Sequence, residues 1–114
     1  MEIAPFTIQI TSDGMGDADQ ELRHKLIKTY LTLLNESDYL PSVIAFYTAG
    51  VKLLVSGSPV LEQLKALEDK GVRLIACGTC LNHYGLADDL QVGLQGGMTD
   101  IIEAQWRADK VITL

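Results

Sequence analysis

Apolar residues along the chain form short β-branched runs that alternate with longer segments of helical spacing. The expected strands cover residues 6–10, 43–47, 72–76 and 110–114, with a weaker strand at 91–94 and a further apolar run at 51–55. The expected helices contain residues 22–34, 60–67 and 99–108, and residues 83–90 form a short irregular or helical piece. Strands that alternate with helices predict right-handed crossovers and an α/β fold with a mostly parallel sheet of about five strands, covered by helices on both faces.

Local signals place the ends of these helices. Asp17 or Asp19 can cap the first helix, where both carboxylates favour the positive end of the helix dipole. Ser58 followed by Pro59 predicts the start of the second helix, because proline at the first turn gives up no N–H that the helix needs. On the first helix, one face is expected to carry Leu22, Leu26, Tyr30, Leu33 and Leu34, and the other Arg23, His24, Lys28 and Thr32.

The length and composition of the chain predict a single domain over residues 1–114. The 114 residues leave no room for a second core, and 47% hydrophobic with 21% charged residues is ordinary for a folded chain. The mean hydropathy of +0.16 is somewhat apolar for so small a domain. Since a small domain has much surface for its volume, we expect part of that apolar surface to lie against another subunit in a homo-oligomer.

Charge and hydropathy exclude two classes of partner. A pI near 4.7 and a net charge of −6 repel phosphate backbones, and no basic stripe is present, so we expect no nucleic-acid partner. No apolar stretch is long enough to span a bilayer and no signal peptide is visible, so we expect no membrane partner. Two cysteines separated by two residues close too small a loop to brace a secreted fold, which favours a cytoplasmic location.

The one concentrated chemical feature is the thiol pair of Cys77 and Cys80, directly after the expected strand at 72–76. In open α/β sheets, function collects at the carboxyl ends of strands. Gly78 lets backbone amides approach an anion there, and Thr79 adds a hydroxyl donor. Free N–H groups and a helix dipole stabilise a thiolate and lower its pKa, which predicts a nucleophilic thiol. One cysteine would carry a transferred sulfur, and the other would attack the Cys–S–S bond, leaving a disulfide and releasing the sulfur.

Two other uses of such a pair fit less well. A thioredoxin-like oxidoreductase needs a cis-proline after its motif, whereas all three prolines of this chain precede Cys77. A closed zinc site needs four protein ligands, and Cys77, Cys80 and His83 supply only three. We therefore expect no metal and no cofactor within one subunit.

Several isolated residues carry weaker signals. The turn at residues 13–17 is superficially like a phosphate loop, but two carboxylates flank it, which favours a tight turn that leads into a capped helix. His24 is expected to be solvated on the polar face of the first helix. His83 and Tyr84 either lend a proton and shape a pocket or simply fill a loop. Trp106 is interpreted as a core or interface residue rather than a ligand-binding one.

The residues around the thiol pair, 76–81 and 84–86, resemble the DsrE/DsrF-like sulfur-relay family, in particular the C-terminal domain of YedF-type proteins linked to selenium metabolism. Similar stretches at 14–17, 49–54, 64–68, 100–104 and 110–114 extend the resemblance over nearly the whole chain. It implies a three-layer α/β/α sandwich, frequently oligomeric, that carries sulfur as a cysteine persulfide. The family's sulfur-bearing cysteine precedes a glycine by eight positions, as Cys77 precedes Gly85, so the resemblance implies Cys77 as carrier and Cys80 as resolving thiol.

The leading hypothesis is therefore a sulfur or selenium relay protein, a sulfurtransferase-like carrier whose site is completed by Gly78, Thr79, His83 and Tyr84. Its expected partners are sulfur donor and acceptor proteins, including TusA/SirA-like ones. Two alternatives stay open. A dithiol redox or sensing module would form a reversible disulfide with no sulfur adduct, and a non-catalytic oligomeric domain would bind a ligand or partner without needing either thiol.

Overall fold

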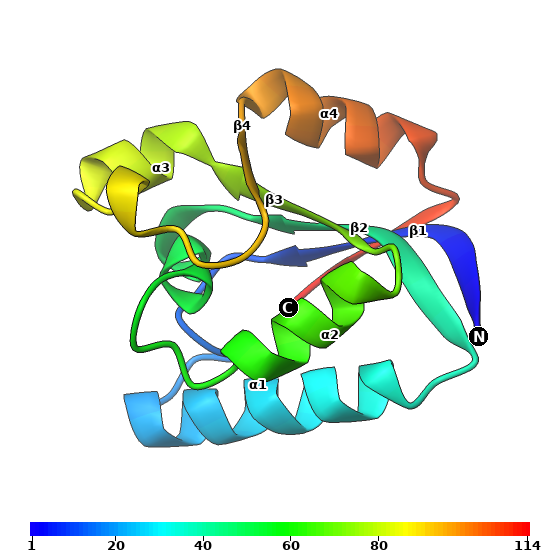
Figure 1. The fold of residues 1–114 in the computed structure, drawn as a ribbon, viewed down its shortest axis with the longest axis horizontal. Coiled ribbons are helices and arrows are strands. Elements are labelled where there is room, and N and C mark those ends of the chain that lie inside the picture. Colours follow the sequence, from blue (N-terminus) through cyan, green and yellow to red (C-terminus); the bar gives the residue numbers. More distant parts are fainter.

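In the computed structural model, which describes residues 1–114, five parallel strands form one sheet in the order β4-β3-β2-β1-β5 (Figure 1). Strands β2, β3 and β4 are added in turn on one side of β1, and β5 pairs with its other side. The expected parallel sheet is confirmed. The strands are β1 (Glu2–Ile10), β2 (Tyr39–Phe46), β3 (Arg73–Cys77), β4 (Leu94–Gly96) and β5 (Lys110–Thr113).

Helices cover both faces of this sheet. Helices α1 and α2 contact each other on one face, and α4 contacts β1 and β3 from the other (Figure 1). The three-layer α/β/α sandwich is therefore confirmed. The helical segments are α1 (Gln20–Asn35), η1 (Thr48–Leu54), α2 (Leu61–Asp69), α3 (Gly78–His83), η2 (Ala87–Asp89) and α4 (Met98–Arg107), of which η1 and η2 are 3-10 helices.

The core is built around the interior strands, above all β1 and β2. Because helices cover both faces, these strands bury side chains on both sides, which explains the continuous apolar run at 43–46 of β2. The two buried polar side chains, Thr7 and Gln9, are hydrogen-bonded to α4 and β5 respectively. Fully buried residues of β1 and β2 are Ile8, Ile10, Leu40, Ile44 and Phe46.

The buried face of α1 differs from the expected one. Ile27 and Leu31 are fully buried, whereas Leu22, Leu26 and Leu33 are 44%, 42% and 59% exposed. The helix turns only one stripe of its surface toward the sheet, and that stripe is centred on Ile27 and Leu31. The three leucines lie beside it, so the spacing indicated a helix correctly but not which side chains it buries.

The signals for helix starts are confirmed at α1 and wrong at α2. Asp19 caps α1, because its Oδ1 accepts the N–H of Leu22 at 2.9 Å. At α2, Ser58 Oγ instead accepts the N–H of Val60 at 3.2 Å within a turn, and the helix begins only at Leu61.

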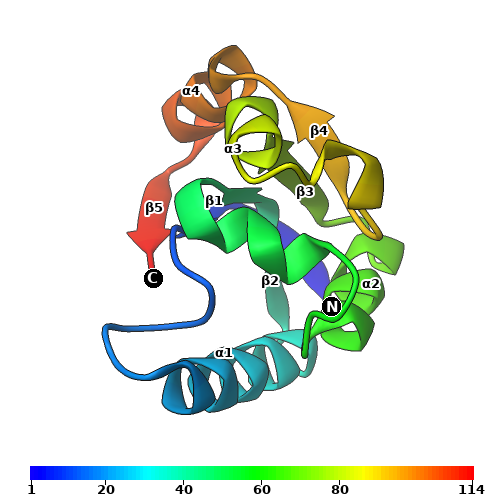
Figure 2. The same ribbon diagram turned by 90° about the vertical axis from the view of Figure 1, so that its left-hand side faces the viewer.

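Figure 2 looks onto the edge of the sheet at which the strands end, and shows η1 and α3 side by side there. The apolar run at 51–55 lies mainly in η1, where Val51, Leu53 and Leu54 are fully buried. Strand β2 ends at Phe46, and η1 begins at Thr48, whose φ is 49°. This edge carries the candidate site.

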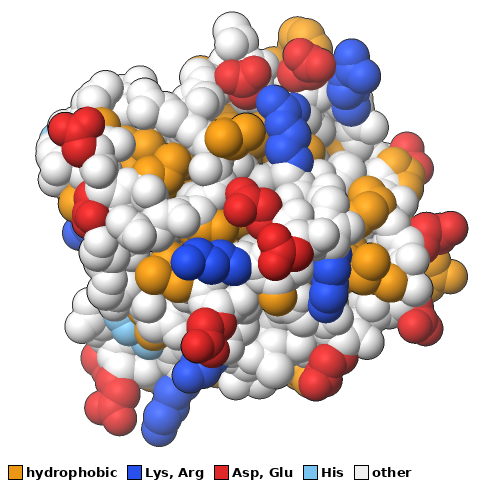
Figure 3. Space-filling model, viewed as in Figure 1, with side chains coloured by type: hydrophobic (Ala, Val, Ile, Leu, Met, Phe, Trp, Pro, Cys, Tyr) orange, Lys and Arg blue, Asp and Glu red, His pale blue; other side chains and the backbone are white.

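The surface in Figure 3 carries acidic and basic side chains interspersed, without an extended area of one sign on that face. None of the helices combines the length and the apolar character needed to cross a membrane. Trp106 on α4 is 82% exposed, so its interpretation as a core residue is wrong. Its interpretation as an interface residue, like the expected homo-oligomer, stays a prediction.

Candidate functional site

Cys77 is the last residue of β3 and immediately precedes α3. Its side chain is only 2% exposed and belongs to the hydrophobic core. Helix α3 begins at Gly78, directly after the strand, and the sequence predicted an irregular or helical piece at 83–90. That expectation is confirmed, because His83 ends α3 and a turn and the short η2 follow it, while the thiol motif itself opens the helix.

Cys80 lies in the first turn of α3 and is only partly buried. Its Sγ accepts a hydrogen bond at 3.0 Å from the backbone N–H of Thr48. Thr48 has a φ of 49°, in the left-handed region that β-branched residues rarely adopt. Its hydroxyl donates to its neighbour's carbonyl, Tyr47 O, at 2.7 Å, and also contacts Thr11 O. The hydroxyl contacts with Tyr47 and Thr11 hold Thr48 in this unusual backbone conformation, which directs its backbone N–H at the Cys80 sulfur.

Burial raises the pKa of the Cys80 thiol above its ordinary value. The neighbouring Cys77 thiol acts in the same direction and the Thr48 N–H in the opposite one, but the N–H does not outweigh the other two causes. The Thr48 N–H therefore does not bring the pKa of the Cys80 thiol below its ordinary value. At neutral pH the thiol is mostly protonated, and a base or a partner must take its proton before it attacks.

The rate of Cys80 alkylation should therefore titrate with an apparent pKa above that of the same cysteine in the unfolded chain. The folded state holds the Cys80 proton more tightly than the unfolded chain does. Protonation of Cys80 therefore stabilises the fold fully at a pH below the thiol pKa of the unfolded chain. This stabilisation is lost as the pH rises through the thiol pKa of the folded state. Iodoacetamide labelling across a pH series, read by peptide mass spectrometry with and without urea, measures both values. A folded value at or below the unfolded one would contradict the assignment.

The other residues predicted at the site lie around the thiols in different ways. Gly78 is buried, and a Cβ at this position would lie 2.7 Å from Nε2 of Gln95 on β4, so glycine allows this close contact. Thr79 is exposed. His83 is also exposed and packs edge-on against Tyr84, with 5.1 Å between the ring centroids. No group of three or more His, Cys, Asp or Glu side chains is arranged to hold a metal ion.

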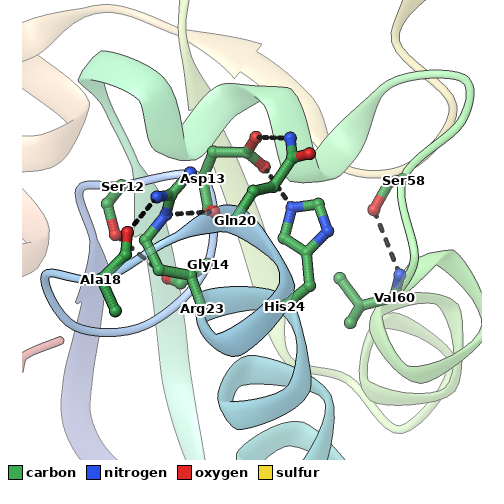
Figure 4. Close-up of polar contacts among 9 residues, drawn as sticks. All are labelled: Ser12, Asp13, Gly14, Ala18, Gln20, Arg23, His24, Ser58 and Val60. Atoms are coloured by element: carbon green, nitrogen blue, oxygen red, sulfur yellow. Dashed lines mark hydrogen bonds and ion pairs between the residues drawn. The ribbon is translucent and has the colours of Figure 1, made fainter.

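His24 is not simply solvated, as the sequence suggested. Its Nε2 lies 3.1 Å from Oδ1 of Asp13, in the loop after β1, and its side chain is only 25% exposed. Gln20 Nε2 donates to the other carboxylate oxygen of Asp13 at 3.3 Å, and Arg23 Nε donates to Asp13 O at 3.2 Å (Figure 4). The loop at 13–17 thus folds back onto α1, so the turn expected there serves to hold a carboxylate against an imidazole.

Sequence reasoning missed Thr48, Asp13 and Lys52 as residues of this edge. Thr48 and Asp13 come shortly after the carboxyl ends of β2 and β1. Since parallel strands end at one edge, residues that follow them in the chain are brought near each other. Because the sequence predicts only a tight turn at 13–17, the signal for Asp13 and Thr48 is the position that they share after the ends of parallel strands.

Comparisons with known proteins agree with this fold. A protein-family model described as the DsrE/DsrF-like family matches residues 6–114. No curated protein matches the sequence. Two structures are similar with a TM-score of 0.69 and cover 97% of this chain and 99% of theirs: the ychN protein from E. coli at 18% identity, and MTH1491, a protein of unknown function from Methanobacterium thermoautotrophicum, at 23%. BT1422 from Bacteroides thetaiotaomicron, also of unknown function, has a TM-score of 0.65 at 15% identity over 95% of this chain and 94% of its own.

Proposed function

The chain belongs to the DsrE/DsrF-like family, and from that membership we propose that it relays sulfur as a persulfide through Cys77 and Cys80. The observation that supports this most is the arrangement of the two thiols at the carboxyl end of β3. One is buried in the core, and the other is partly exposed and held by a backbone N–H. A relay needs one thiol that a partner can reach and a second thiol close behind it.

Burial favours Cys80 as the thiol that receives sulfur, and Cys77 as the resolving thiol, the reverse of the order implied by the family resemblance. Attack on a partner's persulfide requires the two sulfur atoms to meet, and the 2% exposure of Cys77 leaves it out of reach of another protein. In the transfer, the Cys80 thiolate bonds to the outer sulfur of the donor persulfide. The donor's S–S bond breaks, its cysteine leaves as a thiolate, and there is no net oxidation.

The carried sulfur then has two ways to leave. An acceptor thiolate can attack the outer sulfur of the Cys80 persulfide, which forms the acceptor persulfide and returns Cys80 as a thiolate. Alternatively, the Cys77 thiolate attacks the inner sulfur, forming a Cys77–Cys80 disulfide and expelling hydrosulfide. A thiol reductant then restores the pair. TusA/SirA-like proteins are the donors or acceptors we propose to test first, with selenium as an alternative cargo.

Incubation with a cysteine desulfurase and cysteine should add the mass of one sulfur atom to the intact chain, and dithiothreitol should remove it. Peptide mapping then locates the adduct. If no adduct forms under conditions that load a known carrier, the relay proposal fails. A reversible Cys77–Cys80 disulfide without any adduct would instead support the dithiol redox module, which the proximity of the two thiols also favours.

A further inference from the structure

A cavity of about 360 Å³ opens at the carboxyl edge of the sheet. Its walls come from the loop after β1, the start of α1, η1 with the loop that follows it, and the turn after α3. Only 3 of its 11 lining residues are hydrophobic, and its volume is that of a small-molecule site. The thiol chemistry proposed above uses Cys77, Cys80 and Thr48, and none of these three lines the cavity, so the cavity requires a separate explanation.

One wall of the cavity presents the imidazole of His24. Asp13 accepts hydrogen bonds only, so its 3.1 Å contact places the hydrogen of the neutral His24 ring on Nε2. Gln20 donates to the second oxygen of the same carboxylate, which fixes the orientation of the Asp13 carboxylate toward His24 (Figure 4). The Nδ1 atom has no partner within the chain and is left to accept a hydrogen bond from a ligand.

The positive charge in the cavity comes from the ammonium group of Lys52. Its Nζ lies 4.5 Å from the centroid of the Tyr84 ring. The ion pairs that lysine and arginine form in this chain join Glu21 to Lys25 and Glu103 to Arg107, so Lys52 has no carboxylate partner. An ammonium group fixed over an aromatic ring in a concave site is available to bind an anion.

The hydroxyl of Ser58 supplies a further donor. Its oxygen accepts the N–H of Val60 at 3.2 Å, and its hydrogen has no acceptor within the chain. Lys52 is the only lysine or arginine in the lining, and the Asp13 carboxylate is also present. One ammonium beside a resident carboxylate suits a monoanion better than a doubly charged phosphate.

We propose that this cavity binds a small monocarboxylate that also carries a hydroxyl, thiol or amino group. Its carboxylate contacts Lys52 and Ser58, and its second group donates to Nδ1 of His24. This inference goes beyond sulfur relay and does not depend on either thiol.

Titration of the intact chain with lactate and with propionate, followed by amide NMR signals, tests the proposal. Lactate carries both groups and propionate only the carboxylate, so both should shift the signals of the loop at residues 56–58 saturably, with lactate the tighter ligand. Lys52→Gln should weaken both by about tenfold, as the loss of a charge-assisted contact does. His24→Gln keeps a donor near Asp13 but removes Nδ1, so it should abolish only the advantage of lactate.

Lys65→Gln is the matched control, because this lysine is exposed on α2 and does not line the cavity. It should leave both affinities unchanged, and Lys52→Arg should restore most of the binding that Lys52→Gln loses. The proposal is overturned if neither compound gives saturable shifts, if Lys52→Gln behaves like Lys65→Gln, or if inorganic phosphate binds more tightly than lactate.

Discussion

Replacing Cys80 with serine should abolish sulfur loading, so that incubation with a desulfurase and cysteine leaves the mass of the chain unchanged. A hydroxyl cannot form a persulfide, and the remaining thiol, Cys77, is only 2% exposed and out of reach of a donor protein. The Thr48 N–H would still have an oxygen acceptor, so the fold around the site should survive. Intact-protein mass spectrometry gives the loaded fraction, and thermal unfolding checks the fold.

Cys77→Ser is the informative counterpart. Its loaded fraction should equal that of the native chain, because Cys80 keeps its exposure and its amide donor. The adduct should last longer, because no second thiol can expel hydrosulfide by forming a disulfide. Thr79→Ser, at an exposed position between the two thiols, is the control and should behave as the native chain does. If Cys77→Ser abolishes loading and Cys80→Ser does not, the order of the two thiols is the one implied by the family resemblance. If neither does, the chain does not relay sulfur through this pair.

Gly50→Ala should destabilise the fold by about 3 kcal/mol or more, at the upper end of overpacking substitutions. Gly50 is buried in η1, and a Cβ there would lie 2.1 Å from the carbonyl oxygen of Ile10, at the end of β1. That atom belongs to the backbone of a central strand and cannot move aside as a flexible side chain would. Urea unfolding measures the loss against the total of roughly 5–15 kcal/mol that small domains possess.

Gly97→Ala is the control for this effect. A Cβ there would meet nothing closer than 3.6 Å, and Gly97 lies at the start of α4 with a φ of −97°, which alanine also adopts. Gly97→Ala should lower the free energy of unfolding by less than about 1 kcal/mol. A Gly50→Ala variant as stable as Gly97→Ala would contradict the close approach of η1 to β1. Because η1 also carries Thr48, a displaced η1 should change the alkylation rate of Cys80 as well.

Much of the architecture could be predicted from local pattern. The β-branched runs at 6–10 and 43–47 became parts of β1 and β2, and the helical spacing at 22–34 became α1, because burial on both faces of a sheet and on one face of a helix leaves different periods in the sequence. Short segments could not be assigned to helix or strand in this way. Residues 51–55 form mainly a 3-10 helix, and the thiol motif opens α3, since a few residues do not carry enough of a period to distinguish helix from strand.

The candidate site, too, has a part that the sequence determined and a part that only the fold decided. By itself, the sequence determined that two thiols stand at the end of a buried strand, because the motif and the strand before it are contiguous in the chain. Only the tertiary structure decided that Cys77 is buried, that Thr48 donates to Cys80, and that Asp13, His24 and Lys52 share one cavity. The physical reason is that exposure and hydrogen bonding depend on which segments meet at the carboxyl edge. The parallel crossovers bring together residues that lie dozens of positions apart in the chain.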